Sequence, residues 1–369
     1  MQKKLIALAV AGLISAPAFA QSKVEIYGVV DMGYSWKNEN VERGTSSRSG
    51  IDSGQSTGSR LGFRGTEDLG NGLKASFVLE QGINVDRGTS AQNNRTFGRQ
   101  AYLALSSNTV GTVALGRQYT PQYVIGGLVD PFAHGTVGRM DNVYLREDRL
   151  DNLIAYVSPD WGGFSFIAGY TGSAAGDESI SNKGGDIEVF AITPMFKSGP
   201  LLVAFNYHEA RLQRSGQSDD KIKVYDLMGS YDFGVVKIGA AYGHRKVDNF
   251  DYLANAMYGQ PGFADVGEDS DMWMIGATIP LGANNIHKIM ASYSHRDTDR
   301  AVGSDARVSQ WALGYEYALS KRTSLYAAYS DINNNSAAKN SGLHGTVGDA
   351  GNNGLGYQQG ANLGIRHTF

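Results

Sequence analysis

The chain has 369 residues, a formal net charge of −3 and no cysteine. This charge gives no indication of a nucleic-acid partner, and without cysteine the fold cannot depend on disulfides. The composition favours strands joined by tight turns, because it contains 48 glycines, 20 tyrosines and 14 phenylalanines but only 8 prolines.

The first twenty residues have the form of a secretory signal peptide. Lys3 and Lys4 make a basic start, 5–14 is a short apolar run, and 18–20 (Ala-Phe-Ala) is a cleavage motif. About ten apolar residues are too few to cross a bilayer as a helix. We therefore expect an exported chain that begins at Gln21. Without the two lysines it contains 31 basic and 36 acidic residues. Nothing later in the sequence is long and apolar enough for a membrane helix.

From Gln21 onward, apolar side chains alternate with polar or small ones in short segments. In the last segment, Leu363 and Ile365 alternate with Asn362 and Arg366. The same alternation runs through 273–281 and 311–319. Because successive side chains of a strand point to opposite faces, each segment is predicted to be a strand with one apolar and one polar face.

Two kinds of connection alternate along the chain. The short ones fall at 68–72, 106–111, 159–163, 197–200, 231–234, 280–285 and 319–323. The long polar ones fall at about 37–56, 87–94, 120–148, 173–183, 211–220, 248–267, 298–306 and 333–356. Strands of about ten residues, with short turns at one end and long loops at the other, are typical of outer-membrane barrels.

The pattern predicts an all-β protein, a transmembrane antiparallel β-barrel of about 16 strands. It would form one domain over 21–369, with strands from near Lys23 to Phe369. Unpaired strand edges are costly in hydrocarbon, so the first and last strands must pair, and a barrel of this size leaves an aqueous channel. A soluble all-β protein would also alternate. It would not explain apolar alternation up to the last residue or the two classes of connection.

The segment 120–148 differs from its surroundings. It shows neither clean alternation nor a sustained helical period, and glycine and proline interrupt it. A loop of this length inside a compact chain is usually functional. We expect it to fold into the barrel mouth and to narrow the channel.

The longest motif of the chain is Ser-Arg-Leu-Gly-Phe-Arg-Gly-Thr-Glu-Asp-Leu-Gly-Asn-Gly-Leu-Lys-Ala at 59–75. Shorter ones are Glu-Ile-Tyr-Gly at 25–28, Arg-Gln-Ala-Tyr-Leu-Ala-Leu at 99–105, Leu-Gly-Arg-Gln-Tyr-Thr-Pro at 115–121, Tyr-Val-Ser-Pro at 156–159 and the terminal Phe369. In this order they resemble the Gram-negative general diffusion porins, and most closely the trimeric porins of beta-proteobacteria. The resemblance implies a homotrimer of sixteen-stranded barrels, multi-pass in the outer membrane, in contact with lipid and lipopolysaccharide. It also implies passive diffusion of small hydrophilic solutes and ions through a constriction set by the third extracellular loop.

In that family an arginine ladder on the barrel wall faces acidic residues on the loop. The resemblance assigns ladder positions to Arg60 and Arg99, and a looser one to Arg149. Residues that compete with Arg149, or that are secondary candidates, are Arg146, Arg139, Arg64 and Arg95.

Strand alternation bears on these assignments. If Leu61 and Phe63 face lipid, Arg60 and Arg64 face the lumen, because a charge on the lipid face costs roughly 2–4 kcal/mol at mid-membrane. Arg99 shares the alternation of outward-facing residues further along its strand. A bulge, or a position beyond the membrane edge, is therefore needed to turn it inward.

The loop tip departs from the family pattern. Many members have Pro-Glu-Phe-Gly-Gly there, whereas this chain has Pro-Phe-Ala-His-Gly at 131–135, and its nearest carboxylate is Asp130. Loss of a negative charge opposite the arginines makes the throat more positive and favours anions. We therefore expect anion preference, with Asp130 and His134 at the constriction. His134 either tunes the charge with pH or is a solvated loop histidine.

Other classes of function find little support. The seven histidines have no metal-ligand spacing, and no Gly-x-Ser-x-Gly or Walker motif occurs. We expect no enzyme, cofactor or resident metal, although the acidic stretch 268–271 is open as a surface cation site. A barrel protease or lipase lacks a nucleophile–base pair, and the loops are modest for an adhesin. The main alternative to passive diffusion is a substrate-selective channel for organic anions.

Overall fold

A computed structural model of the protein describes residues 23–41, 47–174, 187–212, 220–248, 269–300, 303–347 and 356–369. The expected signal peptide at 1–20 lies outside these ranges, as do parts of several expected long loops, including most of 248–267.

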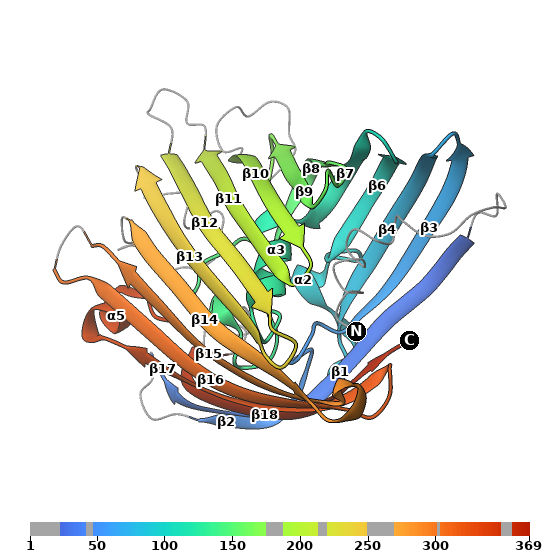
Figure 1. Cartoon of the computed structure of the whole chain (residues 1–369). Helices are drawn as coiled ribbons and strands as arrows, with labels where there is room; N and C mark the ends of the chain where they lie inside the picture. Colours follow the sequence, from blue (N-terminus) through green and yellow to red (C-terminus); the bar gives the residue numbers. More distant parts are fainter. Residues whose placement is uncertain are drawn as a thin grey trace.

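The chain forms one antiparallel sheet whose strands run round a ring (Figure 1). The strands are β1 (Lys23–Asn40), β2 (Arg48–Ser53), β3 (Arg60–Gly70), β4 (Leu73–Asn84), β5 (Thr89–Ser90), β6 (Gln100–Ser107), β7 (Gly111–Tyr119), β8 (Arg149–Val157), β9 (Phe164–Thr171), β10 (Ile187–Ser198), β11 (Leu201–Leu212), β12 (Asp220–Asp232), β13 (Lys237–Asp248), β14 (Ser270–Leu281), β15 (His287–Thr298), β16 (Ala306–Ala318), β17 (Thr323–Asn334) and β18 (Tyr357–Thr368). The helices are α2 (Ala91–Asn94), α3 (Pro121–Val129), η2 (Met140–Asn142), η3 (Ala283–Asn285) and α5 (Ser336–Ser341). None of these described helices is long and apolar enough to cross a membrane.

Eighteen strands are described, but two of them do not add to the ring. β2 and β3 pair with different halves of β1, so together they form one broken barrel strand. β5 pairs only with the last two residues of β4. The barrel therefore has sixteen strands, which confirms the predicted fold and strand number.

The ring closes where the chain ends. β18 pairs with β1 in antiparallel register. The Gly28 amide donates to the Phe369 carbonyl at 3.2 Å, and the Phe369 amide donates to the Gly28 carbonyl at 3.1 Å. A closed barrel has no strand edge, so every backbone group at membrane depth finds a partner.

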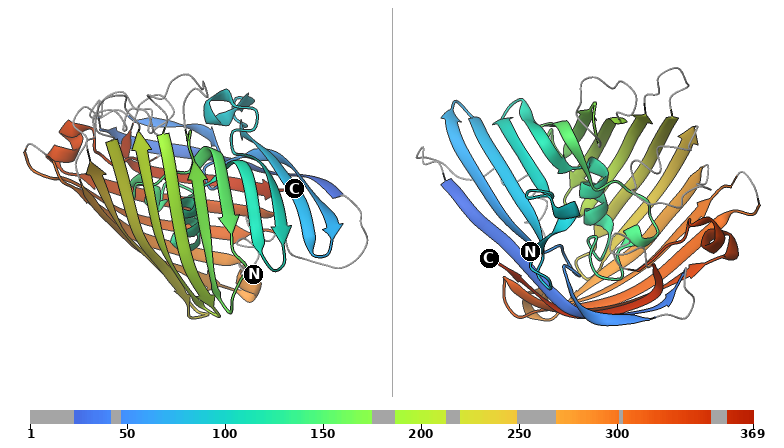
Figure 2. Two further views of the ribbon diagram at one scale, coloured as in Figure 1. Left: turned by 90° about the horizontal axis from the view of Figure 1, so that it is seen from above. Right: turned by 180° about the vertical axis from the view of Figure 1, so that it is seen from behind.

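The two faces of the barrel separate as the alternation predicted. In β6, Leu103 and Leu105 point outward with 59% and 48% of their surface exposed, whereas Ala104 and Ser106 are buried on the inner side. The views in Figure 2 show α3 lying within the ring of strands. The expected short turns are also present. That between β3 and β4 has left-handed φ values of 85°, 51° and 76° at Gly70, Asn71 and Gly72, which glycine and asparagine adopt most easily.

One expected loop was wrong. Residues 37–56 were assigned to a long polar loop, but β1 continues to Asn40 and β2 pairs with it from Arg48 to Ser53. Backbone pairing continues here although the apolar alternation does not. The break in the strand falls instead at 54–59, where the buried carboxylate of Asp31 accepts hydrogen bonds from three successive amides, those of 55–57, at 3.0–3.1 Å.

The outer face generates a prediction. Leu227 lies in the middle of β12 with 55% of its surface exposed. Leu227→Arg should lower the free energy of unfolding by about 2–4 kcal/mol, since arginine at mid-membrane depth must leave water. Urea unfolding in lipid vesicles measures this. Leu227→Ala is the control, because it removes lipid contact without adding charge. Equal effects of the two substitutions would contradict the outward assignment.

Candidate channel constriction

The loop 120–148 begins with a helix that the sequence analysis missed. Thr120 caps α3, because its Oγ1 accepts from the Tyr123 amide at 3.1 Å, and Pro121 occupies the first turn. A capping threonine followed by proline is a helix-start signal. The same hydroxyl donates to the Glu147 carbonyl at 2.5 Å, and the Thr120 amide donates to the Asp148 carbonyl at 3.0 Å. These bonds close the base of the loop.

Residues near both ends of the loop are fixed to β12 and β13. The buried carboxylate of Asp226 accepts from Gln122 Nε2 at 3.0 Å and from the Tyr144 hydroxyl at 2.7 Å. Lys237 Nζ donates to the Leu128 carbonyl at 2.5 Å. A cation at the C-terminal turn of α3 is also favoured by the helix dipole.

The far half of the loop is fixed across the lumen. Gln310 of β16 donates to the carbonyls of Gly138 and Arg139, both at 3.1 Å, and accepts from Asn142 at 2.9 Å. The Thr136 amide donates to the Gln55 carbonyl, in the break between β2 and β3, at 2.5 Å. The loop therefore crosses the inside of the barrel, and polar groups of the wall hold it there.

Glycines on the inner wall make room for this crossing. A Cβ at Gly239 would lie 1.9 Å from the Val129 carbonyl oxygen, and one at Gly276 would lie 2.5 Å from Pro131 Cγ. Any larger residue at these sites would force the loop away from the wall, since real Cβ atoms do not approach so closely.

Between the loop and the opposite wall lies a cavity of about 640 Å³. From the loop it is lined by Pro131, Phe132, Ala133 and Thr136, none of which carries a charge. From the barrel wall it is lined by the basic residues Arg60, Arg64, Lys288, Lys321 and Arg366 and the acidic residues Glu80 and Glu316. We call this space the constriction cavity.

Arg60 and Arg64 both line the cavity, and each has an acidic neighbour on the wall. Arg64 Nε donates to Glu25 at 2.9 Å, and Arg60 Nε lies 3.8 Å from Glu80. Glu80 itself is buried at 3% exposure and accepts from Arg99 Nε at 2.7 Å.

Arg99 and Arg149 do not line the cavity directly. Arg99 Nη2 donates to the Tyr119 hydroxyl at 2.5 Å, and Arg149 Nη2 donates to the same hydroxyl at 3.2 Å. Tyr119 lines the cavity in front of them. Arg99 can turn inward because β6 begins one residue later, at Gln100. It therefore lies outside the strand, and the alternation of side chains along β6 does not determine which way it points.

The other arginine candidates have partners elsewhere. Arg146 Nη2 donates to Asp141 at 2.7 Å inside the loop, and Arg139 Nε lies 3.6 Å from the same carboxylate. Arg95 Nη1 donates to Asp151 at 2.8 Å. None of these three lines the constriction cavity.

Asp130 was expected at the constriction, but it does not line the constriction cavity. Its carboxylate is 4% exposed and accepts from the amides of Phe132, His134 and Met140 at 3.0–3.2 Å. Burial raises the pKa of Asp130, although the neighbouring His134 acts in the opposite direction. The nearest carboxylate to the loop tip thus folds the tip and presents no charge to the cavity.

His134 is neither a pore-lining nor a solvated side chain. It is 3% exposed, its Nδ1 lies 3.2 Å from Asp141 Oδ1, its Nε2 lies 2.9 Å from the Tyr123 carbonyl, and its ring stacks on Tyr123 at 4.6 Å. Asp130, His134 and Asp141 are close enough to hold a metal ion. Their ligand atoms are engaged by backbone groups and arginines, so the cluster is better explained as the internal framework of the loop.

Sequence reasoning missed Lys288, Lys321 and Arg366 at the cavity. Arg366 lies on the polar face of its strand, and this was the only signal that could have found it. Which strands bring these side chains together depends on the closed register, which a single sequence does not specify.

Of the acidic stretch at 268–271, Asp271 Oδ1 accepts from Tyr242 at 2.6 Å and lies 3.1 Å from His244.

An apolar outside, a polar inside and a loop fixed across the lumen define a porin of the Gram-negative outer membrane. The model of the Gram-negative porin family matches residues 7–337. The chain belongs to this family, as its motifs indicated. It is an outer-membrane pore for passive diffusion.

Relatives match along the whole chain. An outer membrane porin protein of Bordetella pertussis is 34% identical over 100% of both chains. The structure of an anion-selective porin from Comamonas acidovorans is 28% identical, covers 95% of this chain and 100% of its own, and has a TM-score of 0.75. A trimer form of OmpT of Vibrio cholerae shares the fold at 18% identity, with 94% and 99% coverage and a TM-score of 0.66.

The wall glycines generate a second prediction. Gly239→Val should displace α3 from β13, because its Cβ would overlap the Val129 carbonyl. We expect a changed single-channel conductance and more current noise in a planar bilayer, with the barrel still folded. Gly50→Val is the control, since nothing lies within 4 Å of a Cβ there. If Gly239→Val conducts like the wild type, the loop does not rest on this wall.

The loop base generates a third prediction. Burial raises the pKa of Glu147 to about 7, and the carboxylate of Asp148 adds to this. The folded state therefore holds a proton that the unfolded state releases near 4.5, so stability should fall as pH rises between these values. Glu147→Gln should reduce this loss of stability by roughly 1 kcal/mol. The figure is smaller than the full pKa shift would give, because the side chain is only partly buried and solvent screens its charge. Thermal unfolding at both ends of the range measures it, and an unchanged pH slope would contradict it.

Proposed function

We propose that this porin prefers anions and passes them by passive diffusion. The observation that carries the proposal is the charge of the constriction cavity: five basic side chains line it, against two acidic ones, and the loop face is uncharged. In a narrow space with low-dielectric walls, such a field raises the local concentration of anions and lowers that of cations. The description of the Comamonas acidovorans structure as an anion-selective porin supports the same reading.

The roles of the individual residues follow from their positions. Arg60 and Arg64 face the permeating ion. Arg99 and Arg149 hold the Tyr119 hydroxyl between them and add positive potential from behind it. Asp130 and His134 act through the shape of the loop tip, as they are buried within it.

Passive diffusion is favoured over a substrate-selective channel and over catalysis. A cavity of about 640 Å³ has room for hydrated ions and small solutes. We further infer that the chain catalyses no reaction, since it belongs to a family of porins, which act as channels.

We also propose the state in which the protein works. Residues 1–20 would be removed on export, leaving 21–369 as one barrel domain. Three barrels would assemble as a homotrimer surrounded by outer-membrane lipid and lipopolysaccharide. Family membership supports this, and OmpT of Vibrio cholerae has a structure described as a trimer form. Gel filtration in detergent with light scattering measures the number of chains.

Ion selectivity tests the function directly. Arg60→Ala should lower the chloride-to-potassium permeability ratio about fivefold, because a unit charge at about 8 Å in water shifts the free energies of the anion and the cation by about 0.5 kcal/mol each, in opposite directions. Reversal potentials in a KCl gradient measure the ratio. A wild-type channel that prefers potassium would refute the proposal.

A gain of negative charge at the loop tip gives a matched test. Ala133 is exposed, lines the constriction cavity and already has a left-handed φ of 48°. Ala133→Glu should reduce the anion preference by a similar factor of about five, whereas Ala133→Gln has nearly the same shape and should not. If Ala133→Glu and Ala133→Gln change the ion selectivity equally, the shape of the loop rather than its charge determines the selectivity.

A further inference from the structure

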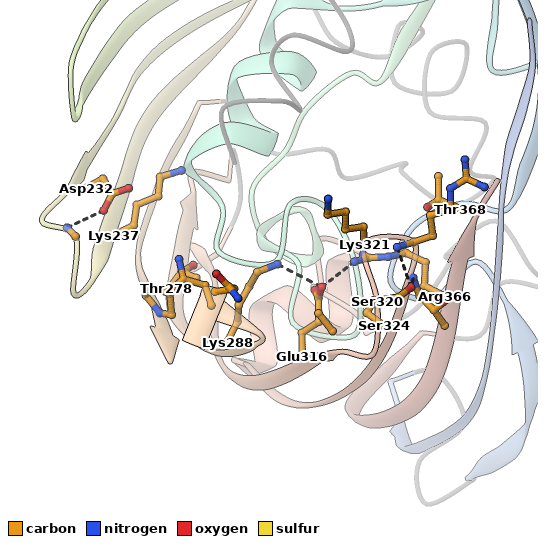
Figure 3. A pocket seen from close by; sticks show the side chains of 17 residues that line it. Asp232, Lys237, Thr278, Lys288, Glu316, Ser320, Lys321, Ser324, Arg366 and Thr368 are labelled. Carbon is orange, nitrogen blue, oxygen red and sulfur yellow. Dashed lines mark hydrogen bonds and ion pairs between the residues drawn. The ribbon is translucent and has the colours of Figure 1, made fainter. Parts of the chain in front are cut away.

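A second cavity, of about 490 Å³, lies at the end of the barrel where the short turns are. Residues of the turns between β12 and β13, between β14 and β15, and between β16 and β17 line it, together with the end of β18 (Figure 3). In outer-membrane barrels short turns face the periplasm. We call this space the periplasmic mouth.

The periplasmic mouth has an excess of positive charge. Its basic lining residues are Lys237, Lys288, Lys321, Arg322 and Arg366, and its acidic ones are Asp232 and Glu316. One carboxylate oxygen, Glu316 Oε1, is shared by Lys288 Nζ at 3.3 Å and by Arg366 Nη2 at 2.9 Å (Figure 3). Asp232 Oδ1 accepts from the amide of Gly234 in its own turn at 2.8 Å. The two carboxylates therefore cannot balance the five cations.

The cations differ in how free they are to meet a ligand. Lys237 is committed to the Leu128 carbonyl. Lys321 is exposed and has no ion-pair partner among the residues that the structure describes. Within the same described part of the chain, Lys288 and Arg366 form ion pairs only with their shared carboxylate, and Arg366 Nη1 also donates to the Ser56 hydroxyl at 3.0 Å. Three cations thus line one space, and among the described residues Glu316 is the only carboxylate that forms an ion pair with any of them.

A buried hydroxyl in the same wall also lacks a partner. Ser324 lines the periplasmic mouth at 5% exposure, and its Oγ makes no hydrogen bond to any residue that the structure describes. Buried polar atoms without a partner are uncommon and call for a reason. A donor hydroxyl beside lysine and arginine side chains is the complement of an oxyanion, which offers several strong acceptor oxygens.

We propose that the periplasmic mouth is a binding site for polyvalent phosphate anions, held by Lys288, Lys321 and Arg366 with the Ser324 hydroxyl. The proposal rests on the anion preference argued above and deepens it. Lysine supplies mobile point charges and arginine a planar fork, a combination that suits phosphate oxygens. The volume is within the range of small-ligand pockets, so the anion can be held with some of its water while the mouth remains open.

The position of the site gives it a role in permeation. Lys288, Lys321 and Arg366 also line the constriction cavity. An anion that passes Arg60 and Arg64 therefore reaches the periplasmic mouth without crossing a region of opposite charge. The open, hydrated surroundings keep each charge contact weak, which allows release into the periplasm. Monovalent chloride gains less from three converging cations than a phosphate with two or more charges.

Block of chloride current by inorganic pyrophosphate tests the proposal. The full chain is reconstituted in a planar bilayer in KCl, and sodium pyrophosphate is added first to one side and then to the other. We expect a saturable reduction of current, with a lower half-blocking concentration from one side than from the other. Lys288→Gln with Lys321→Gln should raise that concentration about tenfold or more, as expected for losing two charge-assisted contacts. Lys321→Gln alone should show a smaller shift in the same direction.

The control removes the same kind of charge at the other mouth. Arg87 lies in the loop after β4 with 56% of its side chain exposed, beside Asp86, and it lines neither cavity. Arg87→Gln should leave the half-blocking concentration unchanged. Sodium sulfate at matched ionic strength separates specific binding of phosphate from screening.

Each outcome decides between the two proposals. If pyrophosphate blocks no better than sulfate, or blocks the double variant as it blocks the wild type, the phosphate site is overturned. The reversal potential in KCl without pyrophosphate reports on anion preference by itself. A chloride-preferring channel without block overturns only the site, whereas a potassium-preferring channel overturns the proposed function.

Discussion

Backbone hydrogen bonding in hydrocarbon is the constraint on which the rest of the structure depends. An unpaired amide or carbonyl costs several kcal/mol at membrane depth, so the sheet must close, and Gly28 and Phe369 complete that closure. Closure in turn determines what the side chains do. With lipid on the outer face, the polar face of every strand must line water, and sixteen strands enclose too wide a space for side chains to fill. A water-filled passage therefore follows from the alternation and the number of the strands alone.

The loop inside that passage is a second consequence of the same geometry. Its backbone lies away from bulk water, so its polar groups need partners on the barrel wall. Asp226, Lys237 and Gln310 supply them from three different strands. Wall glycines such as Gly239 let the loop backbone come close enough for these bonds to form. The width of the channel is thus set by wall residues as much as by the loop.

The fold could be predicted from the sequence because the alternation of residues and the turn signals are local. The error at 37–56 arose where strand pairing continues without apolar alternation, since only side chains that meet lipid must be apolar. The helix after Thr120 was missed although its capping residues are visible in the sequence. The orientation of Asp130 and His134 could not have been found, because it depends on amides and rings that the folded loop brings together. Lys288 and Arg366 meet only through the closed barrel register.

The sign of the net charge does not determine the field inside the lumen. The chain has more acidic than basic residues, yet the cations outnumber the anions along both cavities. The acidic groups near the path accept hydrogen bonds from other protein groups: Glu80 from Arg99, Asp141 from Arg146, and Asp130 from backbone amides. At physiological salt the screening length is about 8 Å, which is comparable with the width of a space of a few hundred Å³. Charges on the wall therefore act across the whole section of the path, and an ion in transit responds to the few unbalanced cations around it rather than to the charge of the protein.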